Sequence, residues 1–437
     1  MKKLLIFFSF LTFSIQVFAQ EMDSVKLNTY FKKLDSTGHM LSTAIWKEGK
    51  VVYENQTGYA DVEKQLKPNT NTPYGIGSIT KTFTAAMIMK AIEEGKIKHK
   101  TLLSDFFPQF ENANQITIDQ LLSHQSGLYN FTNDSLYSSY YTQPISRKKM
   151  LEIIQKYPSV FSPGEKNEYS NTNYVLLSYI LEKIYKKPYK DILNEKIIRP
   201  LGLKHTYFRG DGKRENEAFS YIWEGNKWQK MPQTDPSVPM GAGAIVSTPT
   251  DLMLFADALF NGKIITPKSL SNMTEGNSVY RKGLFLMPFG IKKGFGHTGG
   301  IDGFTSVFVY FPDDRIGAAI TSNGSNANNN DILIILLKAA FQMPFQIPSF
   351  KQINVPLEKL KTYKGVYGSD TFPLDIIIRL EGGILKAQAT GQSEFPLTAK
   401  SENIFVFTPA GIRIEFIPEK KQLILKQAGQ KFILTKK

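Results

Sequence analysis

A short run of residues that is apolar on every side constrains this chain more than any other feature. From Ile79 to Glu94 the apolar residues recur at helical spacing, and residues 85–89 (AAMIM) contain no polar side chain at all. A helix that is apolar all round has to be surrounded by other elements. We therefore predict a buried helix in the middle of a domain that is large enough to cover it.

The segments on either side of this helix predict the elements that cover it. Thr117 and Gln120 have the spacing of a capping box, which predicts a helix that ends at Gly127. Helical spacing predicts further helices over residues 21–38, 172–185, 252–259 and 331–341, and strand-like runs cover residues 41–46, 51–56, 304–311 and 316–321. This mixture predicts a sheet with helices packed against it.

The last part of the chain has a different pattern. Residues 355–437 contain about eight short strand-like runs, separated by turn sequences such as Gly382-Gly383. This spacing is typical of a small antiparallel barrel or sandwich. We find no catalytic motif there, and we predict a first domain over residues 20–342, a linker over 343–354 and a second domain over 355–437.

Residues 1–19 have the pattern of a secretory signal peptide. Lys2 and Lys3 precede an apolar run, and Val17-Phe18-Ala19 then places small residues where a signal peptidase cuts. The alternative, an uncleaved membrane anchor, is disfavoured because the run is short and soon becomes polar. We therefore predict a periplasmic or secreted protein. The chain contains no cysteine, which excludes a lipoprotein anchor at the cleavage site, disulfides and a Cys nucleophile.

Charge and length limit the partners of the mature chain. Removing Lys2 and Lys3 with the signal peptide lowers the net charge from +14 to +12 (14 minus 2) over 418 residues (437 minus 19). Such a surface attracts anionic cell-wall polymers or membrane surfaces. We expect no nucleic-acid partner, because the lysines are scattered and no binding motif is present. We also expect no transmembrane span once the signal peptide is removed.

Ser78 and Lys81 form the first of three short motifs that carry chemistry. A serine hydroxyl is a weak nucleophile at neutral pH and needs a base beside it. If Ser78 lies at the first turn of the apolar helix, Lys81 lies on the same face, where burial would lower its pKa. A serine cap followed by a solvent-facing lysine is the more common explanation of such spacing, so this pair alone decides nothing.

The other two motifs are Tyr169-Ser170-Asn171 and Gly296–Gly300 (GHTGG). A phenol beside an ammonium can pass a proton, and an Asn amide can both donate to and accept from a substrate amide. Glycines around His297-Thr298 allow a strand edge to approach a ligand closely. Taken singly, the first is equally explained by a packed turn with a helix cap, and the second by a bulged strand.

Together and in this order, the three motifs resemble those of the serine hydrolases that include class C β-lactamases, D-alanyl-D-alanine carboxypeptidases, D-aminopeptidases and related esterases. Residues 116–128, 200–203 and 241–259 also look like that family, so the resemblance covers about residues 25–340. It implies an α/β (α+β) fold of the β-lactamase/transpeptidase type, with an antiparallel sheet flanked by helices. The last domain resembles small lipocalin-like barrels appended to such hydrolases.

The resemblance also implies a role for each motif residue. Ser78 is expected to be the acylated nucleophile, with Lys81 and Tyr169 sharing the work of general base and proton return. Asn171, His297, Thr298 and Gly299 are expected to bind the substrate. The backbone N–H groups of Ser78 and Gly300 are expected to form the oxyanion hole. No cofactor and no metal is implied.

His297 is the departure that informs the substrate. β-Lactamases of this type usually carry Lys at this position, a fixed positive charge for the carboxylate of the drug, whereas His is mostly neutral near pH 7. We therefore rank a D-alanyl-D-alanine carboxypeptidase or D-amino-acid peptidase first, acting on small peptides or cell-wall peptidoglycan. A carboxylesterase or class C-type β-lactamase is the alternative, and a non-catalytic sensor of muropeptides or β-lactams is ranked last.

Two other features of the sequence do not indicate catalytic residues. His124 lies in the 116–128 segment and could be read as a triad base, but the Lys–Tyr pair supplies a base and family motifs place this His at a structural helix end. Asn323–Asn330 (NGSNANNN) reads as a plain surface turn that could border the pocket. The remaining histidines have no metal-ligand spacing.

Overall fold

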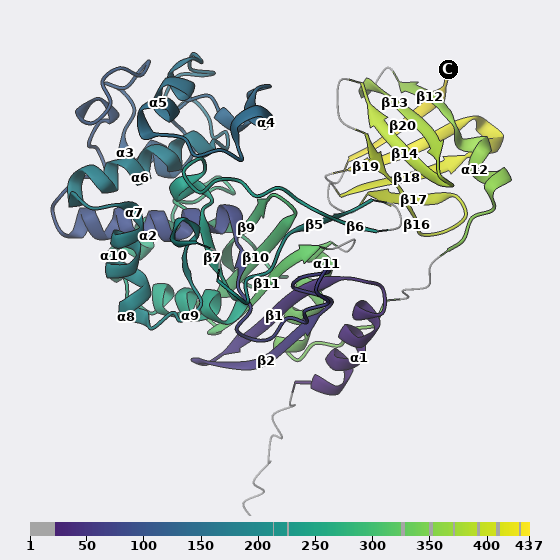
Figure 1. Ribbon diagram of the computed structural model, residues 1–437, viewed down its shortest axis with the longest axis horizontal. Coiled ribbons are helices and arrows are strands. Elements are labelled where there is room, and N and C mark those ends of the chain that lie inside the picture. The colour runs from purple at the N-terminus through teal and green to yellow at the C-terminus, as the bar shows by residue number, and fades with distance from the viewer. Residues whose placement is uncertain are drawn as a thin grey trace, which may run out of the picture.

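The computed structural model describes residues 22–437, except for residues 213, 225–226, 325–327, 349–352, 370–371, 391–393, 408–410 and 428–429 (Figure 1). The predicted signal peptide lies outside the described residues, as do parts of the predicted linker and of the 323–330 turn. Within the described part of the chain, no helix is long and apolar enough to span a membrane.

A six-stranded antiparallel sheet forms the centre of the first domain, in the order β2-β1-β11-β10-β9-β8. One face is covered by α1 (Ser24–Asp35) and α11 (Asn329–Ala340), which share an apolar core with the sheet. The strands are β1 (Met40–Lys47), β2 (Lys50–Thr57), β8 (Phe285–Leu286), β9 (Phe295–Ile301), β10 (Phe304–Phe311) and β11 (Ile316–Gly324). All four strands predicted in this domain are therefore present.

The other face of the sheet carries the larger core. There α9 (Pro249–Phe260) packs on β1, β10 and β11, and the Phe83 and Phe255 rings stack 3.8 Å apart to join it to α2 (Thr80–Glu93). The remaining helices of this domain are α3 (Ile118–Leu122), α4 (Tyr137–Tyr140), α5 (Arg147–Gln155), α6 (Asn171–Tyr185), α7 (Tyr189–Leu193), α8 (Arg199–Leu201) and α10 (Pro267–Thr274). They form a mostly helical lobe around α2 (Figure 1).

The structure confirms the predicted buried helix, and it shows that the helix predicted to end at Gly127 is shorter. Every residue of α2 from Thr80 to Met89 is buried, as expected for a segment that is apolar all round. The capping box of Thr117 and Gln120 is present, but α3 ends at Leu122, five residues before the predicted end at Gly127. His124 adopts a left-handed φ of 58°, which a helix cannot continue through.

Smaller sheets connect these layers. A three-stranded sheet has the order β3-β7-β4, and its strand β3 precedes the turn that leads into α2. A two-stranded hairpin pairs β5 with β6. Their bounds are β3 (Tyr74–Gly75), β4 (Tyr207–Phe208), β5 (Tyr221–Trp223), β6 (Trp228–Lys230) and β7 (Ile245–Ser247).

The last domain is a near-closed antiparallel barrel with its own core. Its nine described strands follow the order β15-β14-β13-β12-β20-β19-β18-β17-β16, and the two edge strands β15 and β16 are separated by one residue of chain, so the edges approach each other. The strands are β12 (Gly365–Ser369), β13 (Phe372–Glu381), β14 (Ile384–Ala389), β15 (Phe395–Pro396), β16 (Thr398–Ala399), β17 (Ile404–Phe407), β18 (Ile412–Ile417), β19 (Gln422–Gln427) and β20 (Gln430–Lys436).

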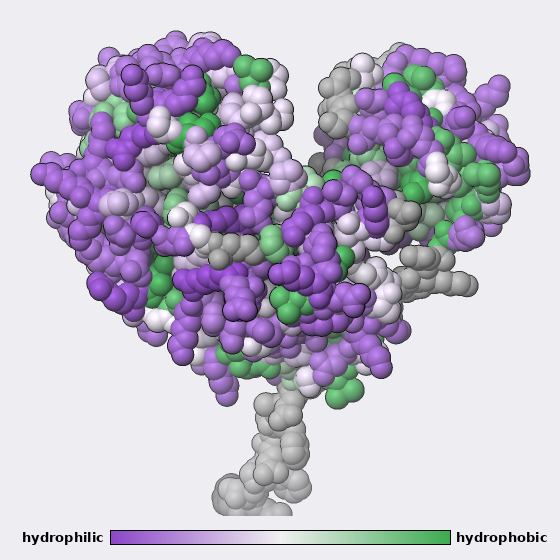
Figure 2. Space-filling view, in the orientation of Figure 1, coloured by the Kyte–Doolittle hydropathy of each residue, from purple (hydrophilic) through white to green (hydrophobic). Residues whose placement is uncertain are grey.

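The barrel interior is apolar. Inward-facing residues alternate along the strands and pack with α12 (Leu357–Tyr363), whose Tyr363 ring stacks on Phe416 at 4.2 Å. A cavity of about 400 Å³ remains among the apolar side chains. The outer face of the whole protein in view is mainly hydrophilic, with single apolar residues scattered over it (Figure 2). Such scattered residues are normal for a folded surface.

Candidate active site

Ser78 lies in a tight turn that packs against a strand edge. The turn is a 3₁₀ segment, Gly77–Ile79, between β3 and α2. Gly77 has a φ of +48°, and a Cβ atom there would lie 2.8 Å from the backbone of Gly300 on β9. A Cβ at Gly299 would lie 2.0 Å from the Ile76 carbonyl oxygen. Glycine is therefore required on both sides of this contact, which brings the backbones of residues 77 and 300 together.

The amine of Lys81 lies beside the Ser78 hydroxyl. Its Nζ is 2.9 Å from Ser78 Oγ, and it also donates to Asn171 Oδ1 at 2.8 Å and to the Ala242 carbonyl oxygen at 2.7 Å. A neutral amine has two N–H donors and one lone pair. Because the two acceptors on Asn171 and Ala242 use both donors, the lone pair of a neutral Lys81 faces the serine O–H.

Burial favours this neutral form. Lys81 has no exposed surface, and the loss of hydration lowers its pKa well below the usual value. The Tyr169 ring centroid lies 4.9 Å from Nζ. Burial raises the pKa of Tyr169, and a hydrogen bond with the Ser78 side chain acts against that rise. Burial therefore favours the uncharged amine of Lys81 and the uncharged phenol of Tyr169 next to the Ser78 hydroxyl, the forms that can pass a proton.

Asn171 is fixed at the start of α6 by residues that the sequence did not indicate. Its backbone N–H donates to Asn130 Oδ1 at 3.0 Å, and its side-chain Nδ2 donates to Thr132 Oγ1 at 3.1 Å. These bonds orient the amide so that Oδ1 accepts from Lys81. Asn130 and Thr132 lie at a short 3₁₀ segment, Phe131–Asn133, and no spacing in the sequence connects them with the motif.

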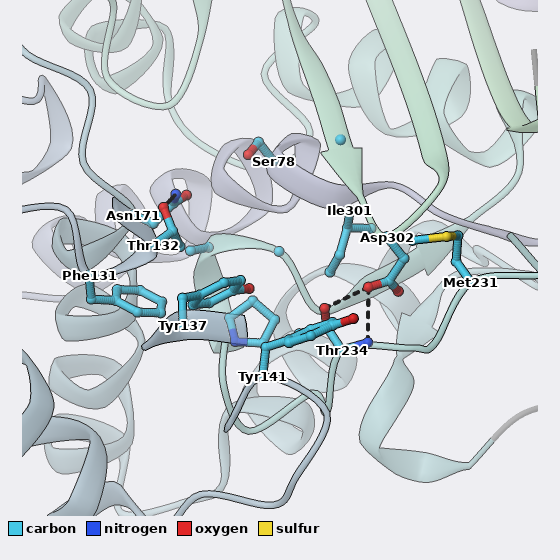
Figure 3. A pocket seen from close by; sticks show the side chains of 14 residues that line it. Ser78, Phe131, Thr132, Tyr137, Tyr141, Asn171, Met231, Thr234, Ile301 and Asp302 are labelled. Atoms are coloured by element: carbon cyan, nitrogen blue, oxygen red, sulfur yellow. Dashed lines mark hydrogen bonds between the residues drawn. The ribbon is translucent and has the colours of Figure 1, made fainter. Parts of the chain in front are cut away.

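A cavity of about 370 Å³ opens in front of Ser78. Figure 3 shows Asn171 on one side and Asp302 with Thr234 on the other, with Tyr137 and Tyr141 between them. The fourteen lining residues are Ser78, Phe131, Thr132, Tyr137, Tyr141, Asn171, Met231, Thr234, Pro239, Ala242, Gly243, Gly300, Ile301 and Asp302. They come from segments far apart in the chain, and the motifs predicted only Ser78, Asn171 and Gly300 among them.

Comparison with known proteins identifies the family. A family model described as Beta-lactamase matches residues 27–340, which is most of the chain. The protein belongs to the β-lactamase family of serine hydrolases. Its first domain has the β-lactamase/transpeptidase fold, as the motifs predicted.

Individual members of this family resemble the chain at moderate identity. The putative penicillin-binding protein PbpX of Bacillus subtilis (strain 168) is 28% identical over 310 residues, which cover 70% of this chain and 74% of that protein. The teichoic acid D-alanine hydrolase of Staphylococcus aureus (strain MRSA252) is 26% identical over 300 residues, covering 67% and 72%.

Solved structures of the family superpose on this one. A D-amino acid amidase from Ochrobactrum anthropi SV3 is 26% identical with a TM-score of 0.65, over 72% of this chain and 99% of that chain. An octameric penicillin-binding protein homologue from Pyrococcus abyssi is 25% identical with a TM-score of 0.67, over 95% of this chain and all of that chain. The second match therefore extends over the barrel domain.

Within this β-lactamase-family site, His297 is buried on β9. It is 1% exposed, and its ring stacks on Phe285 with the centroids 4.1 Å apart. Nδ1 lies 2.5 Å from the Thr298 carbonyl oxygen, an acceptor, so Nδ1 carries the proton. Burial lowers the pKa of His297 to about 3, which makes the ring neutral. His297, Thr298 and Gly299 are absent from the described lining of the cavity, and their contact with substrate stays a prediction.

His124 is buried just beyond the end of α3. It is 2% exposed, and its Nδ1 accepts the Ser170 backbone N–H at 3.1 Å. Its ring lies 4.5 Å from the Tyr169 ring and 5.6 Å from the Tyr280 ring. Burial lowers its pKa well below the usual value, so the ring is neutral. His124 thus supports the backbone on which Tyr169 is placed.

Proposed function

We propose that this β-lactamase-family protein hydrolyses amides, peptides or esters of D-amino acids through an acyl-enzyme on Ser78. The observation that carries this proposal is the position of Lys81, with its Nζ 2.9 Å from Ser78 Oγ and both of its neutral-form donors occupied elsewhere. A serine with a base in this position is an activated nucleophile. Relatives named as a D-amino acid amidase and a teichoic acid D-alanine hydrolase support the choice of acyl group.

The proposed reaction has two halves. Lys81 takes the Ser78 proton while Oγ bonds to the substrate carbonyl carbon, and the oxyanion faces the backbone N–H groups of Ser78 and Gly300. Lys81, with Tyr169 beside it, then returns the proton to the leaving nitrogen or oxygen as its bond to carbon breaks. Water attacks the resulting ester in the same way, releasing the acid and restoring Ser78.

The charges of the cavity favour some substrates over others. Among its described lining residues none is cationic, and the neutral, buried His297 stands where β-lactamases usually have Lys. A substrate that presents a carboxylate, such as a β-lactam or a peptide with a free C-terminus, finds no positive partner there. We therefore rank a D-aminopeptidase or amidase activity above a D-alanyl-D-alanine carboxypeptidase, and both above a β-lactamase.

A substrate panel tests this proposal. We expect the protein to release p-nitroaniline from D-alanine p-nitroanilide at least about tenfold faster than from the L-enantiomer, since a pocket of fixed shape discriminates between enantiomers. The Ser78→Ala variant should be inactive on both. Ser78-dependent hydrolysis of p-nitrophenyl acetate without any amide hydrolysis would favour an esterase, and consumption of benzylpenicillin alone would favour a β-lactamase.

We also propose that the protein is exported and acts in the periplasm or outside the cell. Residues 1–19 support this by their basic start, apolar run and small residues before Gln20. N-terminal sequencing of the protein from the periplasm or medium is expected to start at Gln20. Recovery only in the cytoplasm with Met1 intact would contradict export.

A further inference from the structure

Asp302 lines the active-site cavity and has an oxygen without a hydrogen bond. It lies in the turn between β9 and β10 with a left-handed φ of +55°, a conformation that costs energy for a residue other than glycine. Oδ1 accepts the backbone N–H of Thr234 at 3.0 Å and its hydroxyl at 2.6 Å. The Asp302 side chain has no exposed surface, so water does not hydrate it, and its Oδ2 has no hydrogen-bond partner.

Two buried carboxylates share one guanidinium beside the cavity, and burial raises the pKa of Asp302. Arg209 Nη1 lies 3.7 Å from Asp302 Oδ2, beyond hydrogen-bond distance, while its Nη2 donates to Glu217 Oε1 at 3.1 Å. One guanidinium thus stands between two carboxylates whose side chains are fully buried. Of the fourteen described residues that line the cavity, Asp302 alone carries a formal charge.

Aromatic rings complete this end of the cavity. Tyr137 and Tyr141 stack with their centroids 5.6 Å apart, and both line the cavity (Figure 3). Tyr137 lines the same cavity as Thr234 and Asp302, and burial raises the pKa of its phenol. Aromatic faces attract cations, and a buried carboxylate does so more strongly.

We propose that Asp302, Tyr137 and Tyr141 form a subsite for an ammonium group of the substrate, the free α-amino group of an aminoacyl amide or ester. A ligand ammonium would supply the donor that Asp302 Oδ2 lacks and would favour the ionised form of this buried carboxyl group. This inference rests on the proposed function, because it takes the acyl group to be held between Ser78 and Asp302. It selects substrates with a free amino group over N-acylated stem peptides.

Direct binding tests the subsite without turnover. Isothermal titration calorimetry of the full chain is expected to show that 2-phenylethylammonium binds at least about tenfold more tightly than the neutral 2-phenylethanol, since only the cation is attracted by the carboxylate whose Oδ2 lacks a hydrogen bond. In Asp302→Asn this preference should disappear, while the Asn amide oxygen can still accept from Thr234. Asp211→Asn removes an exposed carboxylate outside the cavity and should keep the preference.

Kinetics provide the second readout. For Asp302→Asn we expect kcat/KM to fall at least about tenfold on D-alanine p-nitroanilide, mainly through KM, and less than about twofold on its N-acetyl derivative. An equal loss on both substrates, or an unchanged ammonium preference in calorimetry, would overturn the subsite. If Asp302→Asn does not fold, Tyr137→Leu should weaken the binding of 2-phenylethylammonium relative to that of 2-phenylethanol. An unchanged ratio of the two affinities would overturn the proposed subsite.

The two proposals fail in different ways. If the protein hydrolyses neither anilide, the proposed function fails, and the calorimetric preference still decides the subsite. If D-alanine p-nitroanilide is hydrolysed but Asp302→Asn treats it as the wild type does, the function stands and the subsite is wrong.

Discussion

Replacing Lys81 with methionine is expected to lower kcat/KM by about 10³-fold while the protein stays folded. Methionine fills a similar volume at this fully buried position but cannot accept the Ser78 proton. Steady-state kinetics on any substrate that the wild type hydrolyses would measure the loss. Lys90→Met is the matched control, because Lys90 lies on the same helix and donates to the Ile264 carbonyl away from Ser78. Comparable losses in both variants would contradict a specific role for Lys81.

The same substitution is expected to change how stability depends on pH. Burial lowers the pKa of Lys81 in the folded state, so between that value and the unfolded value of about 10.4 only the unfolded chain binds the proton. Stability of the wild type therefore rises with pH through this window, by about 1.4 kcal/mol per pH unit relative to Lys81→Met. Urea unfolding of both proteins between pH 7.5 and 9.5 would show it. Parallel stability curves would mean that folded Lys81 stays charged.

The second large effect is expected from Gly77→Ala. The new Cβ would lie 2.8 Å from the backbone of Gly300, so the turn that holds Ser78 has to move away from β9. Because the two expected oxyanion donors lie on these two segments, kcat should fall by about 10²-fold or more. The positive φ adds strain of about 1–3 kcal/mol to the folded state. Kinetics and thermal unfolding measure the two effects separately.

Gly95→Ala is the control for this experiment. Gly95 also has a positive φ, of +70°, but a Cβ there would meet nothing within 4 Å. The Gly95→Ala variant should therefore lose stability through backbone strain and keep the kcat of the wild type. If Gly77→Ala loses stability without losing kcat, the contact between residues 77 and 300 does not position the oxyanion donors.

The parts of the site that could be predicted from the sequence depend on short-range spacing. Ser78 and Lys81 are three residues apart, so a helix alone brings them together, and the apolar run of α2 indicated that the lysine would be buried. The strand β10 begins and ends where the strand-like run over residues 304–311 predicted. The even spacing of the last strand-like runs predicted a small antiparallel barrel or sandwich of about eight strands, and the described residues form a near-closed barrel of nine.

The cavity could not be predicted, because tertiary contacts create it. Tyr137 lies at the start of α4, whereas Thr234 and Asp302 lie on two loops, and no common spacing connects the three residues. The position of His297 depends on strand alternation: Phe295 and His297 face the buried side of β9, whereas Thr298 faces outward. The motif indicated the strand but not which side faces the core. The domain boundaries at residues 342 and 355 also stay predictions.

The most direct test of the central claim is the covalent labelling of Ser78. The full chain would be treated with a fluorophosphonate, which reacts with activated serines, and analysed by intact-protein and peptide mass spectrometry. We predict a single adduct on the peptide that contains Ser78, absent in Ser78→Ala and much slower to form in Lys81→Met. An adduct on another residue, or equal labelling of Ser78→Ala, would contradict the assignment of Ser78 as the nucleophile.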